Sequence, residues 1–166
     1  GTMALQGGAG VGKVLQVVSV SKTDVFSTVS QSYVDITGLA ATITPSSATS
    51  KILCVVIGVG GMTSGTAAAR LVRDSTPIQV GDTTSGYTSV SSASLYGGST
   101  DGNNNESIAI SVLDSPFTTS AVTYKVQLIR LEASGTVRIN ALGNDNSGSL
   151  YSQRAASNIT LMEIAA

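Results

Sequence analysis

Histidine and tryptophan are absent from the 166-residue chain, and charged residues make up only 11% of it. Without histidine the chain can form neither a Ser-His-Asp triad nor a Cys-His pair, and it lacks the commonest side-chain ligand of transition metals. Two of its acidic residues could still flank a sugar for glycoside hydrolysis, but no spacing in the sequence singles out such a pair. We therefore predict a protein that is not an enzyme and that has no cofactor.

The single cysteine and the charge balance exclude further classes. Cys54 cannot form an intramolecular disulfide, and its place in the apolar run KILCVVIG predicts a small buried hydrophobic residue. A net charge of −1 with scattered lysines and arginines gives no electrostatic footprint for nucleic acid. The sequence contains no run of 18 apolar residues, so it predicts no membrane span. Low net charge gives little repulsion between copies, which is typical of a protein that sits in an assembly.

The glycine-rich stretch GGAGVGKV, residues 7–14, contains most of a nucleotide-binding P-loop. That motif needs Ser or Thr directly after its lysine, because the hydroxyl holds Mg²⁺, and Val14 stands there instead. The stretch that follows is rich in β-branched residues and indicates a strand, whereas a P-loop leads into a helix. We interpret residues 1–12 as a flexible, glycine-rich N-terminal arm and residues 13–166 as one folded domain.

Apolar residues, 42% of the chain, come in short runs separated by clusters of Gly, Ser, Thr, Asn and Asp, which is a pattern of strands and turns. The run SKILCVVIGVGG (50–61) is apolar on both sides and predicts a central strand buried on both faces. The stretch AAARLVRDS (67–75) fits a helix by propensity, but the turn chemistry of RDSTP favours a strand. The predicted strands cover residues 13–20, 32–39, 41–45, 50–61, 67–75, 77–82, 107–116, 121–131, 136–142 and 158–165. They predict an all-β fold, a single-domain antiparallel β-sandwich of jelly-roll-like type.

Residues 83–107 are almost all small and polar, and they predict either one long exposed loop or two weak edge strands around Val90 and Leu95. Within them, DGNNNE places Asp101, Asn103 and Asn105 at the first, third and fifth positions of an EF-hand loop. That loop also needs glycine at position 6 and glutamate at position 12, where this chain has Glu106 and Val112. The EF-hand is therefore excluded; an irregular calcium site and an ordinary Asn-Gly turn stay open, and we assign no metal ligand.

Three tyrosines lie in segments rich in Ser, Gly and Asn, the mixture that adaptable recognition loops use. They either contact a ligand such as a sugar or fix their own loops to the sandwich. On the first alternative, the segments 83–107 and 143–152 form a ligand-binding surface. Its candidate residues are Tyr87, Tyr96, Asp101, Asn103, Asn104, Asn105, Asn144, Asp145 and Tyr151.

Several motifs along the chain resemble those of small bacteriophage structural proteins and tail-fibre domains, frequent in marine and cyanobacterial phages. The motifs are GKVLQVVS at the start of the domain, then KTDVFST, SYVDITGL, ITPSSATSKIL, RLVRDSTPI and the terminal ITLMEIAA. They span nearly the whole chain and are signatures of strands and turns rather than of catalysis. No binding residues transfer with the resemblance.

The resemblance implies a virion protein, extracellular when mature. It favours a tail-fibre or receptor-binding domain that recognises host surface polysaccharide, with a capsid decoration or head-fibre protein as the alternative. A lectin-like adhesin domain of cellular origin is a third reading. The resemblance also implies a homotrimer, in which burial of apolar faces would suit a chain of low charge. The N-terminal arm is then the expected contact with other virion proteins.

Overall fold

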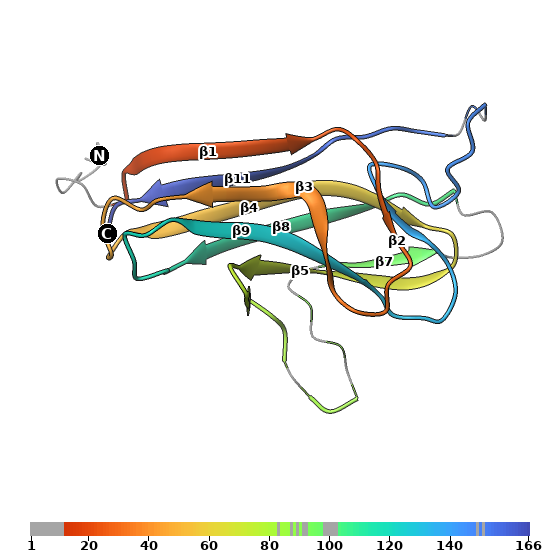
Figure 1. Ribbon diagram of the computed structural model, residues 1–166, viewed down its shortest axis with the longest axis horizontal. Coiled ribbons are helices and arrows are strands. Elements are labelled where there is room, and N and C mark those ends of the chain that lie inside the picture. Colours follow the sequence, from red (N-terminus) through yellow and green to blue (C-terminus); the bar gives the residue numbers. More distant parts are fainter. Residues whose placement is uncertain are drawn as a thin grey trace, which may run out of the picture.

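Eleven strands make up the regular secondary structure in the part of the chain that the structure describes. This computed structural model describes residues 12–82, 84–86, 88, 90, 93–97, 103–148, 150 and 152–166. The strands form two antiparallel sheets that pack on one another (Figure 1), and no helix is present in the described ranges. The predicted all-β fold and antiparallel β-sandwich are confirmed.

Sheet A has the order β1-β11-β4-β10-β2, and β8 pairs with the other side of β4. The strand β4 is central because it is long enough to pair with β11 and then β10 on one side and with β8 on the other. The bounds are β1 (Val14–Lys22), β2 (Phe26–Thr28), β4 (Lys51–Met62), β8 (Glu106–Asp114), β10 (Val137–Ile139) and β11 (Ser157–Ile164).

Sheet B has the order β3-β9-β5-β6, and β7 also pairs with β5. The bounds are β3 (Val34–Ile43), β5 (Gly65–Arg73), β6 (Thr76–Ile78), β7 (Ala93–Gly97) and β9 (Val122–Arg130). The stretch 67–75, which fits a helix by propensity, lies mostly in β5, as predicted. The two strands predicted at 32–39 and 41–45 are one strand, β3. Its register shifts between Asp35 and Ala40, where Gly38 adopts a φ of 82° that suits glycine.

The core lies between the sheets and is filled by every second side chain of the long strands. In β9 the alternation is regular, because the side chains at 122, 124, 126 and 128 are buried and those between them are half-buried. The strand β4 behaves in the same way on one face only: Ile52, Cys54 and Val56 are buried, whereas Ile57 is 58% exposed. The prediction that this strand is buried on both faces is wrong, because no described part of the chain covers the outer side of sheet A.

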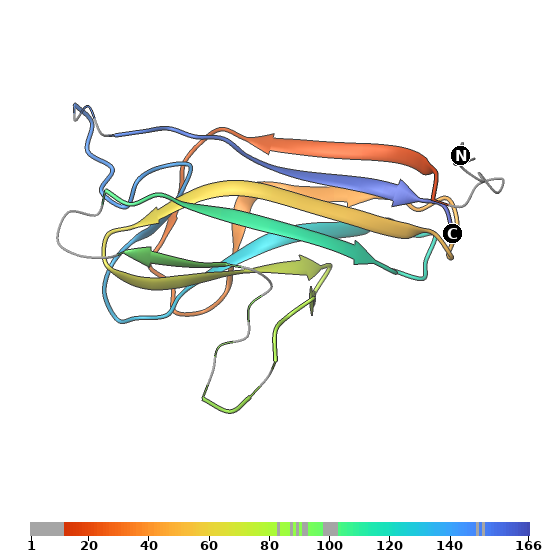
Figure 2. The ribbon, with the colours of Figure 1, turned by 180° about the vertical axis from the view of Figure 1, so that it is seen from behind.

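The N- and C-terminal parts of the domain meet at one end of the sandwich, to the left in Figure 1 and to the right in Figure 2. Gly12 donates its N–H to the backbone oxygen of Ala165, and Ala165 donates to that of Lys13, each at 2.9 Å. We call this region, which includes the start of β4 and the end of β8, the termini end. Residues 1–11 of the predicted arm lie outside the described residues. The described part of the chain holds no helix that could cross a membrane.

Candidate binding site

Two polar segments that are far apart in the sequence meet at the opposite end of the sandwich. A Cβ placed on Gly61 of β4 would lie 2.3 Å from the backbone nitrogen of Gly143 and 2.6 Å from the backbone oxygen of Asn104. Because Gly61 has no side chain, both segments approach the backbone of β4. We call this region the loop end; it comprises Tyr96, residues 103–106 and the described residues of 143–154 (Figures 1 and 2).

The first segment, which comprises Tyr96 and residues 103–106, presents an aromatic ring and amide groups to solvent. Tyr96 is 58% exposed, and its backbone N–H donates to Oε2 of Glu106 at 2.8 Å. This bond joins two strands, since Tyr96 belongs to β7 and Glu106 begins β8. Asn105 donates from Nδ2 to Oε1 of Gln153 at 3.3 Å. The exposed groups of the two segments therefore lie close enough to contact one ligand.

The second segment, the described residues of 143–154, carries an ion pair on a backbone that is bonded to the sheet. Arg154 and Asp145 approach to 2.6 Å, with 53% and 23% of their side chains exposed. Arg154 also forms a β-bridge with Ala141, and the guanidinium of Arg138 donates to the backbone oxygen of Gly143. The pair thus offers a cationic donor and an anionic acceptor side by side, in contact with water, on a backbone that the sheet holds in place.

The structure places six of the nine predicted binding residues at the loop end. Asn103, Asn105, Asn144 and Asp145 are exposed, as Tyr96 is, and Asn104 is half-buried because its backbone packs against β4. The other three predicted residues, Tyr87, Asp101 and Tyr151, lie outside the described residues.

The interpretation of 83–107 as one long loop is wrong, because the strand β7 lies within it. The alternative of two edge strands is half right: β7 surrounds Leu95, whereas the described residues near Val90 form no strand. β7 pairs with β5 from Gly65 to Ala69, and this long-range pairing divides the segment. The described residues between Val80 and Val90 belong to a separate excursion, away from the loop end in both views (Figures 1 and 2).

Sequence reasoning missed three residues of the loop end, Glu106, Gln153 and Arg154, and one residue that supports it, Arg138. One signal was available for Gln153 and Arg154, since they directly follow the polar segment 143–152. Arg138 stands only five residues before Gly143, to whose backbone oxygen its guanidinium donates, but it belongs to the predicted strand 136–142 rather than to the polar segment.

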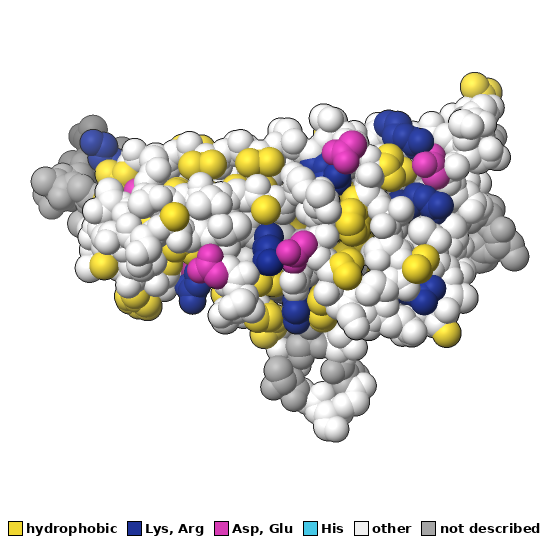
Figure 3. Space-filling view, in the orientation of Figure 1, with side chains coloured by type: hydrophobic (Ala, Val, Ile, Leu, Met, Phe, Trp, Pro, Cys, Tyr) yellow, Lys and Arg dark blue, Asp and Glu magenta, His cyan; other side chains and the backbone are white. Residues whose placement is uncertain are grey.

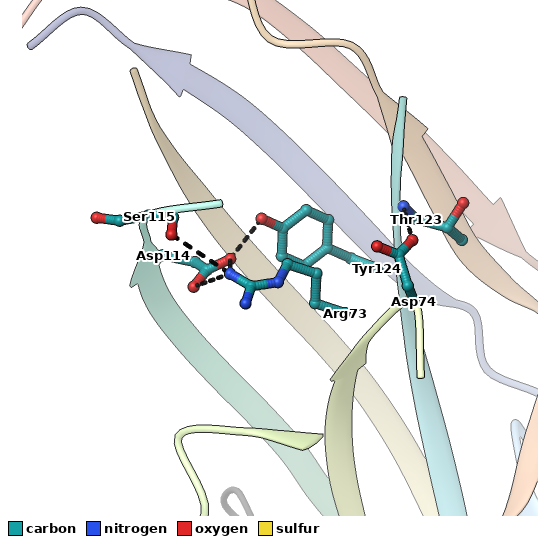
Figure 4. Close-up of polar contacts among 6 residues, drawn as sticks. All are labelled: Arg73, Asp74, Asp114, Ser115, Thr123 and Tyr124. Carbon is teal, nitrogen blue, oxygen red and sulfur yellow. Dashed lines mark hydrogen bonds and ion pairs between the residues drawn. The ribbon is translucent and has the colours of Figure 1, made fainter. Parts of the chain in front are cut away.

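The most concentrated polar cluster of the described residues lies near the termini end, between the sheets (Figure 4). Asp114 of β8 accepts hydrogen bonds from Nη1 of Arg73 at 2.7 and 2.9 Å and from the hydroxyl of Tyr124 at 2.7 Å. Tyr124 is completely buried, and burial, followed by the bond to Asp114, raises the pKa of its hydroxyl. These groups use one another's hydrogen bonds across the two sheets, so the cluster is a structural clamp rather than a site open to substrate.

A second carboxylate, this one fully buried, lies at the same end. Glu163 of β11 is fully buried and accepts hydrogen bonds from the backbone and hydroxyl of Ser46 at 2.7 and 2.6 Å and from Gln16 at 2.6 Å. Burial raises the pKa of Glu163, but the hydrogen bonds from Ser46, Gln16 and Ser50 outweigh it and lower the pKa to about 2. The anion therefore fixes the turn after β3 to β1 and β11.

The thiol of Cys54 is buried as well and is unreactive, since burial raises the pKa of this thiol to about 12.

The outer face of sheet B carries paired charges, seen as neighbouring blue and magenta atoms over β3 and β9 in Figure 3. Asp35 accepts from Lys125 at 2.8 Å and from Gln127 at 2.7 Å, and these bonds, Lys125 first, lower the pKa of Asp35. Arg70 stacks 3.6 Å above the ring centre of Tyr33 and donates to Gln127 at 2.8 Å. The partners satisfy one another, so this face has less to offer a ligand than the loop end has.

Groups of three or more His, Cys, Asp or Glu side chains that could hold a metal ion do not occur among the described residues; Asp101, the first residue of the possible irregular calcium site, lies outside them. A scan against protein-family models finds no match to this chain, and no curated protein matches it either.

Proposed function

We propose that this chain is a structural protein of a bacteriophage virion, and that its loop end binds glycans on the host cell surface without catalysing a reaction. One observation carries the proposal: the exposed polar groups lie at the far end of the sandwich from the paired termini. The central strand β4 has 12 residues, so about 40 Å separates the two ends. An N-terminal arm attached to other virion proteins would leave the loop end facing outward.

The chemistry of the loop end suits a sugar. Sugar hydroxyls bind well to planar donors and acceptors, which the amide of Asn105 and the Asp145–Arg154 pair supply. The ring of Tyr96 offers an exposed aromatic surface at low entropic cost. A lectin-like adhesin domain of cellular origin would use the same groups. The two hypotheses differ in whether a virion or a cell carries the domain.

Binding of fluorescently labelled chain to susceptible cells, and to the polysaccharide extracted from them, tests the proposal. We expect Tyr96→Ala to weaken binding at least about tenfold, the loss typical of an aromatic anchor. Phe117→Ala is the matched control, because Phe117 is an aromatic residue 79% exposed in the turn after β8, at the termini end. A wild-type chain that binds neither cells nor polysaccharide would overturn the proposal.

A capsid decoration or head-fibre protein is the second candidate. The exposed apolar side chains on sheet A, such as Ile57 and Leu113, favour it, because a protein lying on a capsid lattice buries such a face. This candidate predicts many copies per virion and direct binding to assembled capsids. Mass spectrometry of virions decides between them, because a copy number of only a few per particle removes the decoration role.

A further inference from the structure

The outer side of sheet A is a broad surface with little charge: on β1, β4, β8 and β11 the charged outward side chain is that of Lys51, at the termini end. On β1, β11, β4 and β8 the buried side chains alternate with exposed or half-buried ones that point away from sheet B. We call the outward set, up to but not including the row Val14–Ile164–Lys51 at the termini end, the outer A face. It consists of Val17, Ser19, Ser21, Leu53, Val55, Ile57, Val59, Ser107, Ala109, Ser111, Leu113, Asn158, Thr160 and Met162.

Apolar side chains on the outer A face line up across all four strands. Val17 pairs with Met162, Met162 with Leu53, and Leu53 with Leu113. The two ends of this row, Val17 and Leu113, are 56% and 54% exposed. Ile57, one of the outward residues of β4, is 58% exposed. Neighbouring strands thus present one continuous aliphatic row to water, bordered by hydroxyl side chains.

Such a composition is typical of a sheet that faces another sheet. About a quarter to a third of an ordinary protein surface is charged, whereas among the outward side chains of these four strands only Lys51, at the termini end, is charged. Four strands spaced about 4.8 Å apart, each seven residues long with a rise of about 3.3 Å per residue, give a flat area of roughly 450 Å². Val14 and Leu15, 45% and 44% exposed, extend the face toward the termini end. The area approaches the roughly 600 Å² per partner that small stable interfaces bury.

We propose that the outer A face is covered by the same face of a second copy of this chain. An uncharged face matches itself, and its aliphatic row would pack against the row of the partner as two sheets do within a sandwich. The outer face of sheet B is a poorer match, because Asp35, Arg70 and Lys125 would lose water against aliphatic side chains. A closed trimer joins unlike surfaces of neighbouring copies, so the face favours two-fold pairing over the trimer implied by the resemblance.

The solution mass of the full chain, by light scattering on a sizing column, tests this pairing. We expect twice the chain mass of 16.7 kDa for the wild type at tens of micromolar. Ile57→Lys and, separately, Leu113→Lys should return the mass to that of one chain, because a lysine without a partner would be buried at the interface. Val29→Lys is the matched control: Val29 is 57% exposed but lies outside the outer A face, so this variant should remain a dimer.

A far-UV circular dichroism spectrum that superimposes on that of the wild type establishes that each variant is folded. A monomeric wild type would overturn the pairing and leave a virion protein as the cover of this face. A mass of three chains, or a dimer that survives both substitutions, would also overturn it. These measurements use no cell or glycan, so their outcome is independent of the proposed binding function.

Discussion

The two ends of the sandwich contain similar polar side chains but use them in opposite ways. At the termini end, Glu163 is fully buried and Asp114 is half-buried, and Arg73, Tyr124, Ser46 and Gln16 occupy their hydrogen-bonding positions. At the loop end, Arg154 and Asn105 are exposed and Asp145 keeps 23% of its side chain in contact with water, so these groups have capacity left for a further partner. Burial decides the role, because a buried polar group must be satisfied within the protein whereas an exposed one can exchange water for a ligand.

The comparison predicts that substitutions at the termini end reduce stability, whereas exposed side chains of the loop end affect binding alone. We expect the largest loss for Asp114→Ala, about 4 kcal/mol, because it leaves Arg73 and the buried hydroxyl of Tyr124 without their acceptor. Urea unfolding of the purified variant measures this loss. Asp114→Asn keeps one acceptor oxygen and should lose less. A loss below 1 kcal/mol for the alanine variant would show that the clamp is dispensable.

Glu163 makes the stability of the termini end depend on pH. Its folded-state pKa of about 2 lies below the ordinary value of 4.5, so its contribution is complete above pH 4.5 and is lost as the pH falls toward 2. The difference corresponds to roughly 3 kcal/mol. Thermal unfolding between pH 2 and pH 7 measures it. Glu163→Gln should be less stable at pH 7 and should flatten the curve in this window. Parallel curves for the two proteins would contradict this role.

Gly61 is the one position of the loop end where we expect a large structural effect. The Cβ of Gly61→Ala would lie within 3 Å of backbone atoms of Asn104, Leu142 and Gly143, so the two segments must move apart. We expect a loss of about 2 kcal/mol in urea unfolding together with weaker glycan binding. Gly81→Ala is the control, since its Cβ would meet nothing closer than 3.7 Å. Equal stability of the two variants would show that the segments do not need this close approach.

The smallest effect on stability is expected for the exposed ion pair. Asp145→Ala should change the free energy of unfolding by less than about 0.5 kcal/mol, because Arg154 remains solvated. The same variant should weaken binding of the labelled chain to host polysaccharide. A loss of stability comparable to that of Asp114→Ala would erase the difference between the two ends.

The sequence predicted most of the fold because the strands alternate, most regularly in residues 121–131, which became β9. The run at 50–61 led to the wrong prediction of burial on both faces. Its outward residues are aliphatic, but the described part of the chain does not cover them. Composition indicated the polar segments of the loop end. Their convergence could not be predicted, since it depends on the register that places Gly61 beneath both segments, and registers between distant strands are long-range properties.

The most direct test of the central claim is hydrogen–deuterium exchange of the full chain with and without polysaccharide purified from a susceptible host. We predict slower exchange in the backbone around Tyr96, Asn103–Glu106 and residues 143–154, with no change around Ser46, Asp114 and Glu163. Protection confined to the termini end, or no protection at saturating polysaccharide, would contradict the assignment of the loop end as the binding surface.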